Sequence, residues 1–475
     1  MPKAPRTDAG RLSVFSALAF ACAYLPFAAL NTSVAVQLPP FFSKDLGVGL
    51  AVGGLFGLVR LIDIPIDPAL GLMMDRTRTP FGRYRPWIIV GIPILMLALY
   101  MLYQAPVGVT RGTLMIWLLV MYLGTSILVL GVNSWASSLA STYQDRSRIF
   151  GIMSALGVAG SATVMLIPVV VGRVSGGGEA ASVRAVGWFL AGLAPIAIGF
   201  AVLNTPERIV GGAHAARFTL RDYLSLVTRP NVLRILAADL AVTLGPGWMA
   251  ALYIFYWEAS RRVSFGMSNL LLVIYILAGL VGAPVTALLA NRIGKHRALI
   301  VSTTLYSLFL IIIPLTPKGA WIPSVPIMFC LGAFAAGFVV TIRAITADVG
   351  DEIRLEKGSH QMGLLYALTS ATSKVAGAFS ITFTFKVLQM IGYDPKLGPA
   401  NGPAQIHGLE LAFIVGPIFF VMAGGACFLG YKLTADKHAD IRRQLDERDA
   451  VYAEPAAVEA ATGGAMEPLA TPPNA

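Results

Sequence analysis

Residues 61–87 read LIDIPIDPALGLMMDRTRTPFGRYRPW, and this stretch joins two unlike kinds of sequence. It begins within a long apolar segment, yet it places Asp63 and Asp67 four positions apart. Arginines and turn-forming residues follow at once. The pattern is typical of a membrane-spanning helix that carries carboxylates and ends in a basic loop.

The composition of the whole chain predicts a membrane protein. Of its 475 residues, 56% are hydrophobic and 13% are charged, whereas soluble domains carry about 25% charged residues. Mean hydropathy is +0.71. Apolar runs of about 18 residues or more recur along the chain, and each is long enough to cross the apolar core of a bilayer. We therefore expect an all-α membrane protein.

The formal charge of +11 does not indicate a nucleic-acid partner. The basic residues gather in short loops between apolar spans, which is the pattern of cytoplasmic loops in membrane proteins. The three cysteines, Cys22, Cys330 and Cys427, lie within apolar spans and lack the spacing of metal ligands or of a disulfide framework. The sequence therefore predicts neither a metal site nor a cofactor.

Twelve transmembrane helices can be drawn in two six-helix halves. They fall at 12–39, 48–74, 86–106, 112–140, 148–173, 185–204, 233–258, 266–291, 297–316, 322–347, 360–392 and 406–432. The halves are an N-terminal bundle, 12–204, and a C-terminal bundle, 233–432, joined by a linker at 205–232. A tail at 433–475 begins as a charged helix up to Ala450 and then becomes disordered. The arginine-rich loops place both termini, the linker and the tail in the cytoplasm.

Asp63 and Asp67 face the same way, because residues four apart on a helix differ by about 40° in direction. A charge near the bilayer centre costs about 2.5–3.5 kcal/mol on insertion scales. Two carboxylates on one face are therefore expected either in a buried ion pair that locks helices together or at a cation site. Burial and mutual repulsion favour protonation of such a pair, which would let it load and release a proton.

The string D-x-x-x-D-P-x-x-G-x-x-x-D-R-T followed by G-R-Y-R-P-W resembles the glycoside–pentoside–hexuronide:cation symporters of the major facilitator superfamily. The resemblance implies the major facilitator fold and makes Asp63 and Asp67 the cation-binding carboxylates. It also implies a cytoplasmic gate in which charged residues pair with helix ends and acidic groups of the other half. The gate residues are Asp75, Arg76, Arg83 and Arg85, with Gly71 as a small residue that permits close helix contact. The arginines could equally serve topology alone.

A second match covers residues 346–380, where a lysine followed by small residues lies in the middle of the eleventh span. Lys374 holds this position and lies too deep to reach either membrane surface. It needs an anionic partner, and Asp63 or Asp67 in the other half is the expected one. The role of the contact is either ion coupling or a structural salt bridge.

Departures from the family pattern bear on the cation and the solute. Sodium-using members carry an asparagine where this chain has Ile66, and a threonine that helps hold sodium aligns with Leu128. Sodium needs several oxygen ligands and a proton needs one carboxylate, so we expect H⁺ rather than Na⁺. The charged groups that hold sugars in the family are also missing, since Gly131 and Met153 stand at two of those positions.

Milder polar and aromatic groups remain to line a substrate cavity, and each could instead join helices to one another. These are Tyr24, Asn31, Gln37, Asn133, Trp135, Trp248, Gln361 and Tyr366. In the seventh span, the Gly245-Pro246-Gly247 sequence is expected to break the helix. Tyr256 and Trp257 are expected in an aromatic belt at the membrane interface.

The function that these features predict is proton-coupled symport of a small organic solute, such as a sugar or glycoside, by alternating access. The alternatives are a cation-coupled carrier of an amphipathic solute such as a lysolipid, and a membrane receptor on the same fold. We expect no enzyme, because the motifs of catalytic and nucleotide sites are absent. The expected partners are the solute, a monovalent cation and the lipid bilayer. The protein is expected to act as a monomer in the inner membrane.

Overall fold

The structure is a computed structural model that describes residues 14–139, 143–174, 176–205, 207, 225–357 and 362–462. Its elements are helical throughout these residues. Twelve long spans cross the body of the molecule. They are α1 (Val14–Ala21) with α2 (Tyr24–Val36), α4 (Val52–Arg76), α5 (Arg85–Tyr103), α6 (Arg111–Leu139), α7 (Tyr143–Val174), α8 (Glu179–Asn204), α10 (Pro230–Phe255), α11 (Phe265–Ile293), α12 (Lys295–Ile312), α13 (Val325–Lys357), α14 (Met362–Met390) and α15 (Pro403–Ala426).

Eleven of these spans are long and apolar enough to cross a membrane. The twelfth, α14, has 29 residues but contains Lys374 and many hydroxyl side chains. The prediction of an all-α membrane protein with about twelve spans is confirmed. The first span differs from the expectation, because it is interrupted at Cys22 and Ala23 and its helical course continues beyond Gln37 through α3 (Leu38–Pro40) and η1 (Phe41–Asp45).

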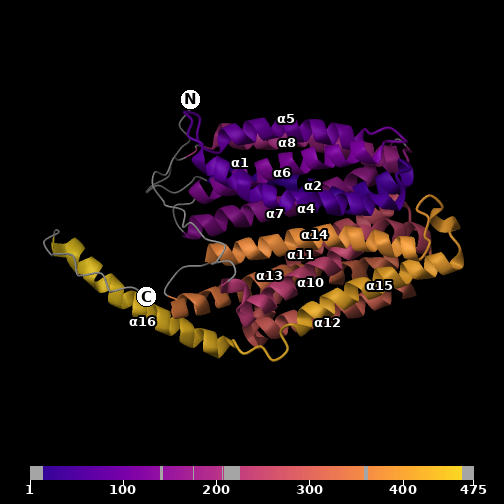
Figure 1. Ribbon diagram of the computed structural model, residues 1–475. Helices are drawn as coiled ribbons and strands as arrows, with labels where there is room; N and C mark the ends of the chain where they lie inside the picture. The colour runs from indigo at the N-terminus through magenta and orange to yellow at the C-terminus, as the bar shows by residue number, and fades with distance from the viewer. Residues whose placement is uncertain are drawn as a thin grey trace.

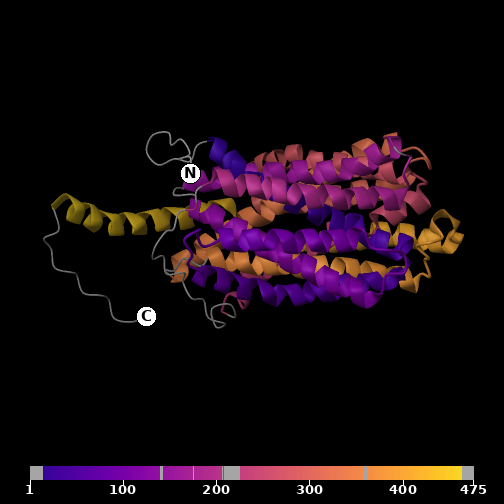
Figure 2. The ribbon, with the colours of Figure 1, turned by 90° about the horizontal axis from the view of Figure 1, so that it is seen from above.

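The spans form two halves that lie against each other along their length (Figure 1). The helices α1 to α8 pack among themselves, as do α10 to α15. Across the boundary, α4 packs against α14, α7 against α11, and α2 against α10. A further helix, α16 (Ala435–Thr462), extends from one end of the bundle and contacts α13 (Figure 2). We call that end the α16 end and the opposite one the Lys44 end.

The crossing of α4 and α14 depends on two glycines of α4. A Cβ atom built at Gly53 would lie 2.3 Å from Phe385 Cβ, and one built at Gly57 would lie 1.8 Å from Thr382 Oγ1. Neither position has room for a larger side chain while the backbones stay this close. The prediction that Gly71 permits close helix contact is wrong, since a Cβ built there meets nothing within 4 Å. Gly71 lies past the crossing, toward the α16 end.

Two expectations for the seventh span are also wrong. Helix α10 runs unbroken through Pro246, because a membrane helix can tolerate proline when neighbouring helices pack against it. The flanking glycines instead allow close packing, since a Cβ at Gly245 would lie 2.4 Å from a methyl of Val421 on α15. Tyr256 and Trp257 are fully buried, so they belong to the core and not to an interfacial belt. Tyr256 stacks on Phe413 with ring centroids 3.9 Å apart.

The tail helix α16 continues to Thr462, past the charged segment that ends at Ala450. Its first turns are fastened to α13, where His438 lies 3.1 Å from Asp351 and Ile441 and Leu445 are buried. Residues 463–475 lie outside the described residues.

Candidate functional site

A cluster of charged side chains joins the two halves in the middle of the bundle. Lys374 Nζ on α14 lies 3.0 Å from Asp63 Oδ2 on α4 and also bonds to Asp67 Oδ2. The Asp63 side chain is 1% exposed, whereas those of Asp67 and Lys374 are 24% and 18% exposed. The contact that the sequence predicts between Lys374 and the two carboxylates is therefore present.

Two further side chains, which the sequence analysis missed, complete the surroundings of Asp63. Ser126 Oγ on α6 donates a 2.9 Å hydrogen bond to Asp63 Oδ1. Arg60 Nη1 lies 3.6 Å from Asp63 Oδ2, and the Arg60 guanidinium lies 4.8 Å from the centre of the Tyr122 ring. The three-residue spacing of Arg60 and Asp63 was a local signal for this pair. Nothing local connects Ser126 to Asp63, because they lie on different helices.

The cluster is electrically balanced, with Arg60 and Lys374 opposite Asp63 and Asp67. Balance matters here because an uncompensated buried charge is far more costly than a paired one. The two carboxylates are nevertheless unlike. Asp63 is enclosed and saturated by three partners, while Asp67 Oδ1 is buried with no hydrogen-bond partner among the described residues. Asp67 therefore keeps one oxygen free for a proton or a cation.

Two of the residues predicted to form a gate, Arg83 and Arg85, contact the segment that follows α8. The backbone N–H groups of Arg83 and Arg85 donate to the Glu207 carboxylate, at 2.6 and 3.3 Å. The Arg85 guanidinium donates to the Thr205 carbonyl at the end of α8. Arg76 is exposed, and the side chain of Asp75 is outside the described part of the chain. In this conformation the described contacts of Arg83 and Arg85 are to Thr205 and Glu207, and their pairing with acidic groups of the other half stays a prediction.

Three of the predicted cavity residues are enclosed by protein. Trp135 is 1% exposed, with Phe20 against one side and the Arg85 guanidinium 5.2 Å from its ring centre. Trp248 is buried and its indole N–H donates to the Ala412 carbonyl at 2.9 Å. Gln37 is buried at the boundary of the halves. Stacking of a sugar on Trp135 would therefore need a conformation different from this one.

The other predicted cavity residues are more open. Asn31 and Tyr366 are exposed, and Tyr24 and Asn133 are half-buried. Gln361 lies outside the described residues. A carboxylate that the sequence analysis did not single out, Asp239 on α10, accepts hydrogen bonds from the hydroxyls of Thr372 and Ser373, next to Lys374.

Two six-helix bundles with balanced charges at their boundary define the architecture of a secondary transporter. The sequence pattern of one family, described as MFS/sugar transport protein, matches residues 19–435. The chain belongs to this family, which confirms its resemblance to the glycoside–pentoside–hexuronide:cation symporters.

Individual relatives match over nearly the whole length. The isoprimeverose transporter of Lactiplantibacillus pentosus is 24% identical over 428 residues, which cover 87% of this chain and 86% of the relative. The glucuronide carrier protein homolog of Escherichia coli (strain K12) is 25% identical over 432 residues, covering 88% and 92%. The crystal structure of the nucleoside transporter NupG superposes with a TM-score of 0.64 at 12% identity, covering 88% of this chain and all of that one. The last similarity concerns the fold alone.

Proposed function

We propose that this protein is a proton-coupled symporter that carries a small sugar or glycoside across the inner membrane, with both termini in the cytoplasm. One chain is the working unit, and it catalyses no covalent reaction. The observation that carries the proposal is the contact of Lys374 with Asp63 and Asp67 across the boundary of the halves. Because Lys374 belongs to one half and the carboxylates to the other, a change in the charge of the site changes the attraction between the halves.

The coupling follows from the charges of the cluster. In the empty site the Lys374 ammonium holds the position that a coupling cation would take between the carboxylates. Protonation of Asp67 weakens its attraction for Lys374, while Asp63 keeps Arg60 and Ser126 as partners. The link between α4 and α14 is then looser, and the halves can rock around the site. Deprotonation on the other side restores the link.

The surroundings of the carboxylates favour a proton over sodium. Ser126 supplies one neutral oxygen, but the neighbouring Leu128 is apolar and fully buried. Sodium must replace its water shell with several oxygen ligands, whereas protonation needs only the free oxygen of Asp67. The charge neutrality of the empty cluster is compatible with the loading of one proton at a time.

The proposed solute class rests on the family and on the names of the relatives. Both relatives are named for sugar derivatives. The first span carries no charge between Arg11 and Lys44, so this chain lacks the ionic groups that hold sugar hydroxyls in the family. We therefore expect weak binding of small glycosides. An amphipathic solute such as a lysolipid is the alternative that the assay below separates.

The test uses the full-length protein in liposomes that enclose a pH-sensitive dye, with the membrane potential clamped at zero. Monosaccharides, glycosides, hexuronates and a lysolipid are added outside in turn, with and without sodium. We expect a sugar or glycoside to acidify the interior without sodium, and Asp67→Asn to abolish the signal. The matched control is Asp436→Asn, an exposed carboxylate on α16, which should leave the signal intact.

Three outcomes would contradict parts of the proposal. Acidification by the lysolipid alone would overturn the solute class. A strict need for sodium at constant pH would overturn the proton. Solute binding without any flux, unchanged in Asp67→Asn, would show a receptor on this fold.

A further inference from the structure

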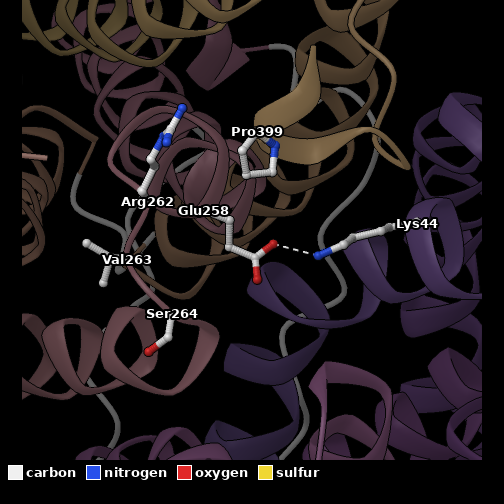
Figure 3. Close-up of a pocket in the computed structure, with 6 residues that line it drawn as sticks. All are labelled: Lys44, Glu258, Arg262, Val263, Ser264 and Pro399. Carbon is white, nitrogen blue, oxygen red and sulfur yellow. Dashed lines mark hydrogen bonds and ion pairs between the residues drawn. The ribbon is translucent and has the colours of Figure 1, made fainter. Parts of the chain in front are cut away.

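A second cluster of charges joins the halves at the Lys44 end, about 30 Å or less from the first by the length of a span. Lys44 Nζ lies 2.6 Å from Glu258 Oε2, which follows α10 in the C-terminal half (Figure 3). The same Nζ also bonds to Glu179 Oε2, at the first turn of α8 in the N-terminal half. One ammonium is therefore shared by a carboxylate of its own half and a carboxylate of the other.

A neutral contact lies deeper on the same path. Gln37 Nε2 donates a 2.8 Å hydrogen bond to Asn269 Oδ1 on α11, and both side chains are almost completely buried. Gln37 precedes Lys44 by seven residues, which is about 10 Å along a helix. The two contacts thus close the boundary of the halves over a depth of roughly two helical turns.

The opposite end has no equivalent contact among the described residues. The ion pairs found there stay within one half, such as Lys295 with Asp348 at 2.6 Å, or fasten α16 to α13. The charges that join the halves therefore lie in the middle of the bundle and at the Lys44 end. With the termini in the cytoplasm, the structure is closed toward the outside.

We infer that Lys44 is the gate residue on the outer side. When the protein opens outward, Lys44 loses its ion pair with Glu258 of the other half and keeps its ion pair with Glu179 of its own half. This inference rests on the proposed function, because it takes alternating access and the orientation from it. Outward opening must separate Lys44 from Glu258, since they belong to different halves. Glu179 moves with Lys44, so the ammonium keeps one ionic partner in the open state and is not left bare.

The space beside the Lys44–Glu258 ion pair gives water from the outside access to the two charges. A cavity of about 430 Å³ is lined by Lys44, Glu258 and Arg262, together with Val263, Ser264 and Pro399. Figure 3 shows the Lys44 and Glu258 side chains pointing toward each other beside these residues. Water in this cavity can solvate both ions as they part, which lowers the barrier to opening.

The test measures exposure at both ends of the full-length protein and does not need the transported solute. Cys22, Cys330 and Cys427 are replaced by serine, and one reporter cysteine is introduced at a time. Met165→Cys lies beneath the outer contact, where the Met165 sulfur is 3.7 Å from Gln37 Nε2. Ser370→Cys is exposed on α14, one turn from Lys374 toward the α16 end. Labelling by a maleimide is timed in membrane vesicles.

We expect Glu258→Gln and Lys44→Gln to speed labelling of Met165→Cys by about tenfold, or about 1.4 kcal/mol, and to slow labelling of Ser370→Cys. Glu410→Gln is the matched control, because it breaks the 2.6 Å pair with Arg261 at the same end but within one half. It should change neither rate. The exchange Lys44→Glu with Glu258→Lys again places one lysine between two carboxylates and should restore the wild-type rates.

Several results would overturn the inference. If Glu179→Gln speeds labelling of Met165→Cys as much as Glu258→Gln does, the cluster is a structural network without a gate. Faster labelling of both reporters at once, with a lower melting temperature, would show general loosening. Unchanged rates in Glu258→Gln would exclude a contribution to closure. By contrast, reciprocal labelling of the two reporters without solute flux in the liposome assay would support the gate and overturn only the proposed solute or cation.

Discussion

At the scale of single residues, the surroundings of each charge decide what it can do. Asp63 and Asp67 are the same residue on one face of one helix, yet Asp63 is enclosed by three partners and Asp67 retains a free oxygen. The sequence predicted both as cation-coupling residues, and their roles stay a prediction. The difference between them arises from Ser126 and Arg60, which surround only Asp63.

Asp45, which follows Lys44 in the chain, predicts a pH dependence of stability. Burial raises the pKa of Asp45 to about 6, and nearby Glu258 adds to the rise while Lys44 and Arg184 oppose it. The neighbouring Glu179 also faces this group. One Asp45 oxygen is buried without a hydrogen-bond partner among the described residues. Because the folded pKa lies above the model-peptide value of 3.8, this group stabilises the fold less as the pH rises from about 4 to about 6.

We expect Asp45→Asn to raise the melting temperature in detergent by about 1 °C at pH 7.5, with the gain shrinking toward pH 4. The reason is that asparagine removes the burial penalty of the ionised form, about 1 kcal/mol after allowance for solvent screening. Thermal unfolding of both proteins across this pH range measures the effect. Asp436→Asn, at an exposed site, should follow the wild type at every pH. A gain that is larger at low pH would show that the sign is wrong.

At the scale of elements, the boundary of the halves is built from a few close helix crossings. Helix α4 carries both the carboxylates and the glycines that bring it against α14, so the ion cluster and the crossing belong to the same pair of helices. Apolar length alone predicted most span bounds to within about six residues, but α13 ends at Lys357, ten residues past the predicted end of the tenth span. The packing role of individual glycines was not, because a glycine has no side-chain pattern that shows which neighbour it meets.

The α4–α14 crossing predicts opposite effects for two adjacent glycines. In Gly53→Ala the new methyl would lie 2.3 Å from Phe385 Cβ and 3.1 Å from the Ile381 carbonyl oxygen, so the helices must move apart. We expect a loss of about 1–3 kcal/mol in stability. In Gly54→Ala the methyl meets nothing within 4 Å, and stability should hold or rise by about 0.5–1 kcal/mol. Thermal unfolding compares the two, and equal effects would argue against close packing at this crossing.

At the scale of the whole molecule, few polar contacts among the described residues join the two halves. The central cluster ties them in the middle and the Lys44 cluster ties them at one end. Transport by alternating access requires the second of these to open in every cycle. A fixed link across the halves at that end should therefore stop transport even though the central site is untouched.

A reversible link tests this requirement. Gln37→Cys with Asn269→Cys, in the cysteine-free protein, is bridged by a short bis-methanethiosulfonate reagent across the boundary where the native side chains meet. We expect solute flux to fall to background and to return after reduction. The control pair, Lys295→Cys with Asp348→Cys, joins groups of one half, so its link should spare the flux. Full flux through the bridged Gln37–Asn269 pair would exclude separation of the halves at this end.

The sequence by itself determined the membrane class, the number of spans and the partnership of Lys374 with Asp63 and Asp67. Each of these rests on a physical rule that is local or nearly so: the apolar length needed to cross a bilayer, helical spacing, and the cost of an unpaired buried charge. Only the tertiary structure decided that Ser126 reaches Asp63, that Tyr256 and Trp257 are core residues and that Lys44 joins the halves. Those contacts link residues far apart in the chain, and the spacing of one helix carries no information about which face of another helix lies opposite it.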